Sequence, residues 1–584
     1  MKIRTLGLSA IALTAFIQSS AQAQVCTGAG PCLTFNSTAP GSYGFSVAIL
    51  SDYDPPAAPA TGGKRELAIL AQTPFGGICR IVRGESGGST PVDLASVGGV
   101  GAGSVVISVG NIDGFPGDEF AISNPTAGSI AVWSLRQPTS GSTFTTLLLK
   151  SITGPQSLGT AMVMVDTQSG RRLAAGVPGQ DQVLLYDLST PGLNPAPTQT
   201  LVPFNPQASP LPAGSPNGSF GASLAVGPKL TPPLGSAPTQ SILAVGTPNY
   251  GTFTSPSTII PSIGFVGIFD MSQGSTASGR QPDRFLYRGV AREFFGTAVA
   301  SVGFLPETTQ IVSPLSDFVV LGRSLTPGVN SVLAACHTPN SVGPGLTPLY
   351  GSPIFLATAS SAAFGQLVAA GDIDGDGLGD VVGTLSTAGG VVRYSTAGGN
   401  LTPFATGATY ALTTTGPLTL ASGPDVFGKG ATDVVVGAPR INNGGGLVEV
   451  LPMANNIRLP NPEGNALARL DAVGRPGVTG FGMRITAPSG NLAFLLGADA
   501  PPVPVLLEGT TFNYLPAGFI NFGGGLVPAG QAGVPSGLGQ LNLPISIPGG
   551  FNFEGLVFQA IQFNAPAFAT FTVSNGILSR IGSW

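Results

Sequence analysis

The chain has little charge and few of the side chains that carry out chemistry. Of its 584 residues only 9% are Asp, Glu, Lys or Arg, and it has one histidine, four cysteines and two tryptophans. The net charge is -4, and no cluster of Lys and Arg occurs downstream of the N-terminus. Such a chain has no basic field with which to bind phosphates, so we expect no nucleic-acid partner. Two tryptophans are also too few for a repeated aromatic platform that stacks sugars.

The single histidine restricts the possible catalytic machinery. His337 is the one available imidazole base, and its surroundings, LAACHTPNS, lack a nucleophile elbow of the G-x-S-x-G type. The adjacent thiol of Cys336 would point to the opposite face of a strand. We therefore interpret His337 as a satisfied or exposed histidine and predict that the protein is not an enzyme.

Long apolar runs are missing outside the N-terminus. Residues 1–23 begin with a basic stretch, continue with an apolar one, and end in Ala-Gln-Ala. This is the pattern of a secretory signal peptide, so the mature chain is expected to start near Gln24. No later run reaches the ~20 apolar residues that span a bilayer. The sequence predicts a secreted or cell-surface protein without a membrane span.

Cysteine usage agrees with an oxidising compartment but not with a disulfide scaffold. Four cysteines are too few to form a disulfide scaffold in a chain of this length. Cys26 and Cys32 flank a short turn and are the preferred pair, and Cys79 and Cys336 are left either free or joined.

Glycine and proline, in contrast, are abundant. There are 86 glycines and 53 prolines beside 42% hydrophobic residues, as expected for many short strands joined by tight turns. The hydrophobic content is too high for a disordered chain. The sequence therefore predicts an all-β protein.

A repeat runs through most of the chain. Each copy opens with an aromatic or apolar residue before a glycine, and a second β-rich run follows that ends in a glycine or proline turn. The second runs are ELAILAQTP, EFAISNP, RLAAGVPG, SILAVGTPN, DFVVLGRS, DVVGTLS, DVVVGAPR and AFLLGADAP. Eight candidate openings occur, at Tyr43-Gly44, Val100-Gly101, Leu158-Gly159, Phe220-Gly221, Phe295-Gly296, Phe364-Gly365, Thr415-Gly416 and Phe481-Gly482. A third run follows most copies, as in IAVWSL, VLLYDL, FVGIFDM, LVEVLPM and VPVLLEG. The spacing suits four-stranded blades that pack radially, and thus a closed β-propeller.

Two copies carry the motif that identifies the repeat. FGQLVAAGDIDGDGLGDVVGT at 364–384 is similar to the FG-GAP repeat of integrin-α propellers and of related secreted bacterial proteins, and DVVVGAPR at 433–440 contains its GAP half. The resemblance covers about residues 40–507. It implies a propeller of usually seven blades, whereas eight openings are present. Seven and eight blades both stay open, with the first or the last opening as the candidate false positive.

The acidic loop within 364–384 predicts a calcium site. Asp372, Asp374, Asp376 and Asp380 alternate along a glycine-rich loop and would supply carboxylates, with the carbonyl of Leu378 at the seventh position. Ca²⁺ prefers six to eight such oxygen ligands. The flanks resemble strands, and position twelve is a glycine instead of the glutamate of an EF-hand. We expect the β-hairpin calcium loop of the propeller family, with a role in bracing its blade.

Two further loops align with this one in altered form. In GNIDGFPGDEF the first, third and ninth positions are Asn111, Asp113 and Glu119, but Phe115 replaces the central aspartate. A hydrogen-bonded turn is favoured there over a second metal site. In the seventh copy Asp425 and Asp433 remain and Lys429 takes the central position, which predicts an internal ion pair in place of the metal.

After about Gly509 the repeat stops. Residues 508–584 alternate apolar and polar residues between turns, as in a small β-sandwich, and a last irregular blade is the alternative. Gly555–Gln559 and Ser574–Leu578 resemble the G-L-x-x-x-Q and S-N-x-L strands of a C-terminal module on secreted bacterial repeat proteins. The expected domains are thus a signal peptide (1–23), a propeller (24–507) and a C-terminal β-module (508–584).

The function expected from these features is binding. A secreted, calcium-stabilised propeller would recognise an extracellular protein or glycan through its variable loops, such as 54–64, 203–218 and 250–262. The alternatives are an extracellular hydrolase or lyase acting on glycans or phosphodiesters, and a structural cell-surface component. The ligand and the oligomeric state are not encoded in any pattern of the sequence.

Overall fold

The structure is a computed structural model of the chain. It describes residues 33–36, 42–50, 65–73, 76–83, 93–115, 117–136, 144–203, 218–229, 239–250, 252–255, 258–260, 264–273, 279–286, 293–303, 315–323, 331–336, 338, 355–361, 364–371, 379–385, 390–395, 402–403, 409–411, 418–424, 432–439, 446–452, 456–458, 469–473, 482–498, 505–507, 510–512, 520–529, 537–545, 556–566 and 571–579. The predicted signal peptide, the Cys26–Cys32 pair and His337 lie outside these residues.

The described residues form antiparallel β-sheets, with one short 3-10 turn at Pro178–Gln180. The first three sheets are β2 (Ser42–Ile49), β3 (Leu67–Thr73), β4 (Gly76–Val82) and β5 (Asp93–Val100); β6 (Val106–Gly110), β7 (Glu119–Asn124), β8 (Ser129–Arg136) and β9 (Thr145–Thr153); and β10 (Met162–Thr167), β11 (Gly170–Val177), β12 (Gln182–Tyr186) and β13 (Pro197–Leu201). The next two are β14 (Ser223–Lys229), β15 (Thr239–Thr247), β18 (Phe265–Asp270) and β19 (Arg284–Leu286); and β20 (Phe295–Gly303), β21 (Asp317–Gly322), β22 (Ser331–Cys336) and β23 (Phe355–Ser361).

Two more sheets complete this series. One is β24 (Phe364–Gly371), β25 (Asp380–Leu385), β26 (Gly390–Ser395), β27 (Thr402–Pro403) and β28 (Thr409–Ala411). The other is β29 (Thr419–Pro424), β30 (Thr432–Ala438), β31 (Leu447–Pro452) and, from the start of the chain, β1 (Leu33–Asn36). The all-β prediction is confirmed.

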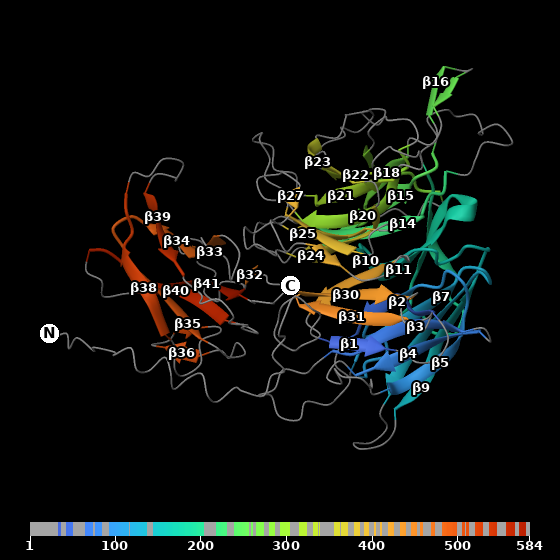
Figure 1. Ribbon diagram of the computed structural model, residues 1–584, viewed down its shortest axis with the longest axis horizontal. Helices are drawn as coiled ribbons and strands as arrows, with labels where there is room; N and C mark the ends of the chain where they lie inside the picture. The colour runs from blue at the N-terminus through green and yellow to red at the C-terminus, as the bar shows by residue number, and fades with distance from the viewer. Residues whose placement is uncertain are drawn as a thin grey trace.

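The first strands of these sheets contact one another in a closed cycle. β2 contacts β6, then β10, β14, β20, β24 and β29 follow in chain order, and β29 contacts β2 again. Figure 1 shows the sheets arranged around this ring. The chain is therefore a β-propeller, in which each sheet buries its faces against its two neighbours.

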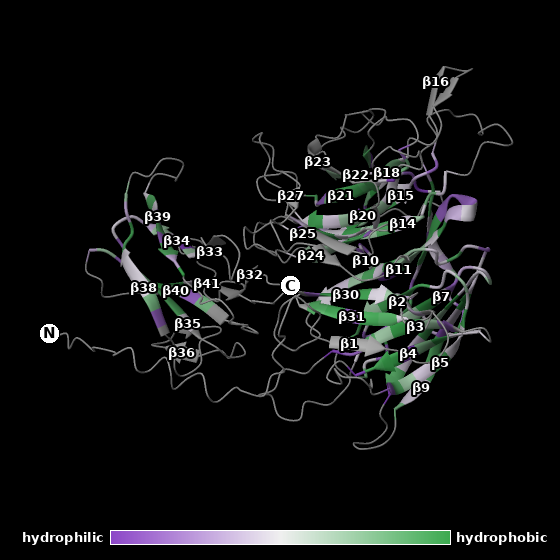
Figure 2. Cartoon of the chain, viewed as in Figure 1, coloured by the Kyte–Doolittle hydropathy of each residue, from purple (hydrophilic) through white to green (hydrophobic). Residues whose placement is uncertain are grey.

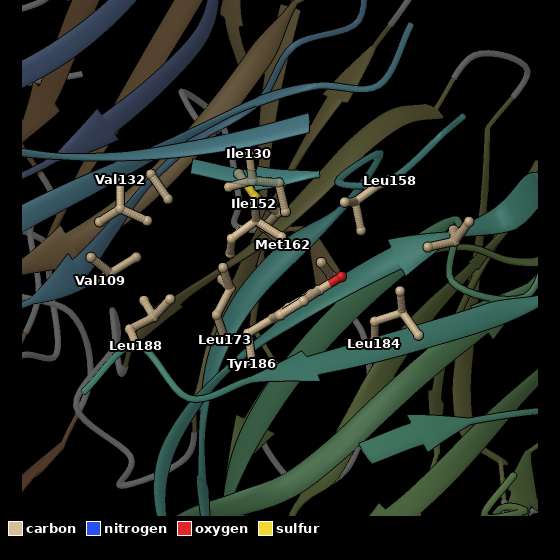
Figure 3. Packing of buried hydrophobic residues seen from close by; sticks show 13 residues of the cluster. Val109, Ile130, Val132, Ile152, Leu158, Met162, Leu173, Leu184, Tyr186 and Leu188 are labelled. Atoms are coloured by element: carbon tan, nitrogen blue, oxygen red, sulfur yellow. The ribbon is translucent and has the colours of Figure 1, made fainter. Parts of the chain in front are cut away.

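The core lies between adjacent sheets. One cluster joins the β6–β9 and β10–β13 sheets, where Val109, Ile130 and Val132 meet Met162, Leu173 and others across the interface (Figure 3). Figure 2 shows the hydrophobic colouring concentrated along the strands of the ring. The second strands are apolar runs without alternation, and in β21 every residue is buried. A strand that is covered on both faces accounts for this pattern.

The opening glycines pack directly on glycines of the preceding sheet. Gly296 has a φ of +93°, which L side chains rarely adopt, and a Cβ on Gly246 would lie 2.1 Å from its carbonyl oxygen. Gly44 (φ +86°) and Gly437 make the same contact, with a distance of 2.0 Å. A third such pair is Gly221 and Gly176. Backbone therefore meets backbone at these interfaces, and the absence of side chains sets the spacing of the sheets.

The N-terminal strand closes the ring. β1 pairs antiparallel with β31, so the sheet that begins at residue 419 takes its fourth strand from residues 33–36. At the same junction the Thr419 hydroxyl donates to the carbonyl oxygen of Gly44 at 2.8 Å, and Tyr43 forms a bridge with Gly446. The first and last sheets are thereby joined by backbone pairing as well as by packing.

The residues after β31 build two other sheets, drawn beside the ring in Figure 1. One sheet has the order β32-β41-β40-β35-β38 and the other the order β33-β34-β39. Their bounds, with those of a separate hairpin β36–β37, are β32 (Asn456–Arg458), β33 (Arg469–Val473), β34 (Gly482–Pro488), β35 (Leu492–Ala498), β36 (Val505–Leu507), β37 (Thr510–Phe512), β38 (Ile520–Leu526), β39 (Leu538–Pro544), β40 (Leu556–Phe563) and β41 (Phe571–Ser579). One hydrophobic cluster, which includes Leu470, Ile485, Leu495 and Phe558, unites both sheets.

The eighth repeat copy lies in these sheets. Gly482 of the Phe481-Gly482 opening begins β34, which pairs with β33 and β39, and the second run forms β35, which pairs with β38 and β40. The third run, VPVLLEG, was expected to be a third strand of the same sheet; this is wrong, because β36 pairs with β37 instead. The predicted boundary at residue 507 falls between strands of one sheet.

The two strands singled out near the C-terminus do pair. They contribute to β40 and β41, where Gln559 Nε2 donates to the carbonyl oxygen of Ser574 at 3.0 Å and the Ser574 hydroxyl accepts from the Ala560 N–H at 2.9 Å. Gln559 and Ser574 are fully buried. Both motif residues thus hold the same strand junction together.

Candidate functional site

The predicted calcium loop connects β24 to β25. Asp372, Asp374, Asp376 and Leu378 lie outside the described residues, so their arrangement stays a prediction. Asp380 is described; it is the first residue of β25 and is fully buried.

The end of this loop is fixed against the neighbouring sheet. The Gly379 N–H donates to the carbonyl oxygen of Val302 in β20 at 3.1 Å, and a Cβ at Gly379 would lie 2.5 Å from that oxygen. Asp380, the one ligand candidate in the described part, is therefore held at a defined place beside β20.

The equivalent loop between β6 and β7 is closed by its own hydrogen bonds. Asn111 Oδ1 accepts from the Gly114 N–H at 2.7 Å, and the Asn111 amide donates to the carbonyl oxygen of Phe115. Asp113 Oδ1 accepts from the Phe115 N–H at 2.9 Å. These are the side chain to backbone bonds typical of Asx turns, and they match the favoured interpretation of this loop as a hydrogen-bonded turn.

A cation from the third strand of the same sheet enters this loop. Arg136, at the end of β8, pairs with Asp113 Oδ2 at 2.7 Å, and its guanidinium carbon lies 4.1 Å from the centre of the Phe115 ring. The Asp113 side chain is only 10% exposed, so its charge is compensated mainly within the protein. Sequence reasoning missed Arg136, because the contact depends on the register of β7 and β8.

The last residue of this loop is a buried acid. Burial raises the pKa of Glu119 to about 7, the Ile112 N–H bond to its carboxylate acts in the opposite direction, and the charge of Asp113 raises the pKa further. For Asp113, burial acts to raise the pKa, but hydrogen bonds from Phe115 and Arg136 outweigh it and hold the pKa below the usual range. Asp113 is therefore the ionised acid of the pair near neutral pH, while Glu119 titrates there.

The seventh loop is only partly described. Asp425 and Lys429 lie outside the described residues, and the predicted ion pair among them stays a prediction. Asp433, next to the start of β30, is fully buried like Asp380. The ninth residue of all three aligned loops is therefore buried at or next to the start of a second strand.

The same position is buried and polar in every sheet of the ring. It lies at or next to the start of the apolar core of the second strand, and its occupants are Glu66, Glu119, Arg172, Ser241, Asp317, Asp380 and Asp433. Asp317, for example, accepts from the Thr338 N–H at 2.7 Å. Buried polar groups need such partners. An alignment of all seven second runs would have revealed this row of buried polar residues. The three acidic loops alone indicated only part of it.

Two sheets carry an Asp turn at the end of the third strand. Asp187 Oδ1 accepts from the N–H and the hydroxyl of Ser189, at 2.9 and 2.6 Å, and its Oδ2 pairs with Arg172 at 3.2 Å. Asp270 repeats this with Ser272 and Lys229.

The loops after these turns cover the outer edge of the preceding sheet. Lys150 Nζ, from β9, donates to the carbonyl oxygen of Gly192 at 2.9 Å, and the Ser151 N–H donates to that of Leu193. The Val202 N–H, next to β13, donates to the carbonyl oxygen of Arg280. Exposed edge strands invite unwanted pairing, so these loops protect the ring.

Other expected features have a plain outcome. Cys79 and Cys336 are both buried and are not joined in a disulfide, which decides between the two alternatives for this pair. Within the described ranges no group of three or more His, Cys, Asp or Glu residues could hold a metal ion. No helix among the described residues is long and apolar enough to cross a membrane.

One of the three expected recognition loops contains a described element. Residues 252–255 and 258–260 form β16 (Thr252–Ser255) and β17 (Thr258–Ile260), a hairpin that pairs with no other described strand. Figure 1 shows it projecting from the ring. Its base is anchored by Tyr250, whose ring packs edge-on against Phe265 with centroids 4.8 Å apart. The loop at 54–64 and nearly all of the one at 203–218 lie outside the described residues.

Comparison with known proteins gives no family. No protein-family model matches the chain, and no curated protein matches it. Among solved structures, Sqt1 of Chaetomium thermophilum bound to the N-terminus of ribosomal protein L10 is 13% identical and has a TM-score of 0.38, covering 78% of this chain and 96% of its own. A chain of the polycomb repressive complex 2 of the same organism is 9% identical with a TM-score of 0.35, covering 62% and 70%. Likeness at this level carries no argument, and the propeller assignment rests on the ring of sheets itself.

Proposed function

We propose that the protein is a secreted, calcium-stabilised β-propeller that binds an extracellular protein or glycan. The observation that carries this proposal is the β16–β17 hairpin. It extends from a ring whose sheets are locked together by glycine contacts, and it takes no part in the ring's own pairing. A projecting hairpin on a rigid frame is a typical recognition element.

We infer that the propeller has seven blades and belongs to the FG-GAP type. Seven sheets of the described residues take part in the cycle of first strands, while the eighth copy pairs within the C-terminal sheets. The glycine of the FG opening packs on the glycine of the GAP half in the preceding blade, as Gly44 does on Gly437. The C-terminal module then begins between β31 and β32, near residue 453, and not at residue 508.

Calcium is proposed at the loop between β24 and β25. The donors would be the carboxylates of Asp372, Asp374, Asp376 and Asp380 and the carbonyl of Leu378. Four carboxylates and a carbonyl are hard oxygen donors, which fit Ca²⁺ in chemistry and number. The position of Asp380 supports this, because it places one of these carboxylates at the base of the loop, next to the Gly379 contact with β20. The metal would brace the sixth blade against β20.

The test is a binding screen with matched hairpin variants. Residues 24–584 are probed against a glycan array and a panel of cell-envelope proteins, in calcium and in chelator. One variant has residues 252–260 replaced by a short Gly-Ser turn, and the control has the same turn in place of 505–512, the isolated β36–β37 hairpin. We expect saturable binding to one class of ligand that the first variant loses and the control keeps. Absence of binding by the intact protein would favour a structural cell-surface component, and equal binding by both variants would refute the role of the hairpin.

A further inference from the structure

The 111–119 loop and the 372–380 loop differ in a reciprocal way. The fifth position is Asp376 in one and Phe115 in the other. The loop that lacks the central carboxylate is also the one that receives a guanidinium, from Arg136.

The strand register aligns the third strands of the second and sixth sheets residue by residue. Phe120 pairs with Trp133, and Val381, the matching residue of the sixth sheet, pairs with Tyr394. Arg136 lies three residues after Trp133, and the residue three after Tyr394 is Ala397. In this alignment of the two third strands, the residue that corresponds to Arg136 is the uncharged Ala397.

Arg136 contacts the positions that a metal would bridge. Its guanidinium pairs with Asp113, at position three, and stacks on the ring of Phe115, at position five. Its side chain is 29% exposed and that of Asp113 is 10% exposed, so the pair lies at the protein boundary and not in free solution. A guanidinium suits this place, since it can pair with a carboxylate and stack on an aromatic face together.

We infer that Arg136 is the built-in cation of the 111–119 loop and makes the second blade independent of the metal that braces the sixth. The comparison with the 372–380 loop rests on the calcium role proposed for that loop. The contacts of Arg136 with Asp113 and Phe115 do not depend on it. Lys429, at the fifth position of the seventh loop, would be a second side-chain cation that takes the place of a metal. The second, sixth and seventh blades would then be braced by a guanidinium, a metal ion and an ammonium group, respectively.

The test restores the metal loop in two steps. Phe115→Asp returns the central carboxylate, and Arg136→Gln removes the guanidinium. Both changes are made singly and together in an Asp374→Ala background, so that the 372–380 loop contributes no binding. Calcium uptake is counted by titration calorimetry. We expect the double variant to bind one calcium equivalent more than Phe115→Asp, and to bind it more tightly than Arg136→Gln, whose loop lacks the central carboxylate.

Two results would overturn the inference. Calcium uptake by Phe115→Asp alone would mean that Arg136 does not occupy the cation's place. No uptake by a folded double variant would mean that the loop is not a metal loop with a substituted cation. The Asp374→Ala variant, compared with the unchanged protein, reports separately on the 372–380 loop, so the two proposals can fail independently.

Single variants cover the case in which the double variant does not fold. In the same Asp374→Ala background, Arg136→Gln should melt at a lower temperature in chelator and recover part of that loss in calcium. Arg136→Lys, which keeps the charge, should melt alike in both in that background. Arg80→Gln is the control, because Arg80 also pairs with a carboxylate, Asp93, at 3.0 Å and lies over an aromatic ring, but has no acidic loop. An equal calcium response of Arg136→Gln and Arg80→Gln would contradict the inference.

Discussion

At the scale of residues, the buried row at the start of the second strands is the most informative feature. Its acids in the second, sixth and seventh sheets could be read from the sequence, because Glu119, Asp380 and Asp433 recur at the ninth position of aligned loops. Arg136 could not be found in this way. It lies 17 residues beyond Glu119, and only the pairing of β7 with β8 brings it to the loop.

The buried acid of the second loop should make stability depend on pH. The pKa of Glu119 is raised to about 7, so the folded state binds this proton more tightly than the unfolded chain does. The stabilising contribution is fully present below the ordinary pKa of about 4 and is lost as the pH rises through about 7. Glu119→Gln removes the titration. In urea unfolding, the free energy of unfolding of the variant should rise relative to that of the unchanged protein between pH 4.5 and pH 8, by roughly 1–3 kcal/mol. Parallel stability profiles would contradict this assignment.

A glycine contact between blades can be tested by adding one methyl group. A Cβ on Gly246 would lie 2.1 Å from the carbonyl oxygen of Gly296, and backbone atoms cannot move aside as a flexible side chain can. Gly246→Ala should destabilise the protein by about 1–3 kcal/mol or more. Gly98→Ala is the control, because a Cβ there meets nothing within 4 Å. Chemical unfolding measures the loss of stability in both variants. Equal losses would show that the contact does not set the blade spacing.

At the scale of elements, the sequence predicted the second and third strands well. The runs it singled out form β3, β7, β11, β15, β21, β25 and β30, and the following runs form third strands such as β8, β12 and β18. The outer strands and β1 were not predicted. They have no shared motif, because an outer strand packs on one sheet edge only and tolerates varied side chains.

Closure of the ring should depend on β1. Removal of residues 24–36 takes away the strand that pairs with β31 and leaves that strand as an unpaired edge. We expect a lower melting temperature and a tendency to self-associate, since open edges pair with other chains. Removal of residues 24–32 alone keeps β1 and serves as the control. Size-exclusion chromatography with thermal unfolding measures both effects, and identical behaviour of the two variants would contradict closure by β1.

At the scale of the whole molecule, local patterns were sufficient for the fold class but not for the division of the chain. The motif at Phe481-Gly482 and the run that forms β35 satisfy the repeat pattern, yet their strands pair with β38 to β40, from residue 520 onward, as well as with β33. Strand pairing over such distances in sequence leaves no local signal. The same reason explains why the sequence places a boundary at residue 507, where the repeat motif stops.

The claim that calcium braces the sixth blade is tested most directly by one pair of melting curves. The mature protein and Asp374→Ala are unfolded thermally, each in calcium and in chelator. The account predicts that the unchanged protein melts at a higher temperature in calcium, whereas the variant melts near the chelator value under both conditions. Identical melting of the two proteins in calcium would contradict the metal assignment.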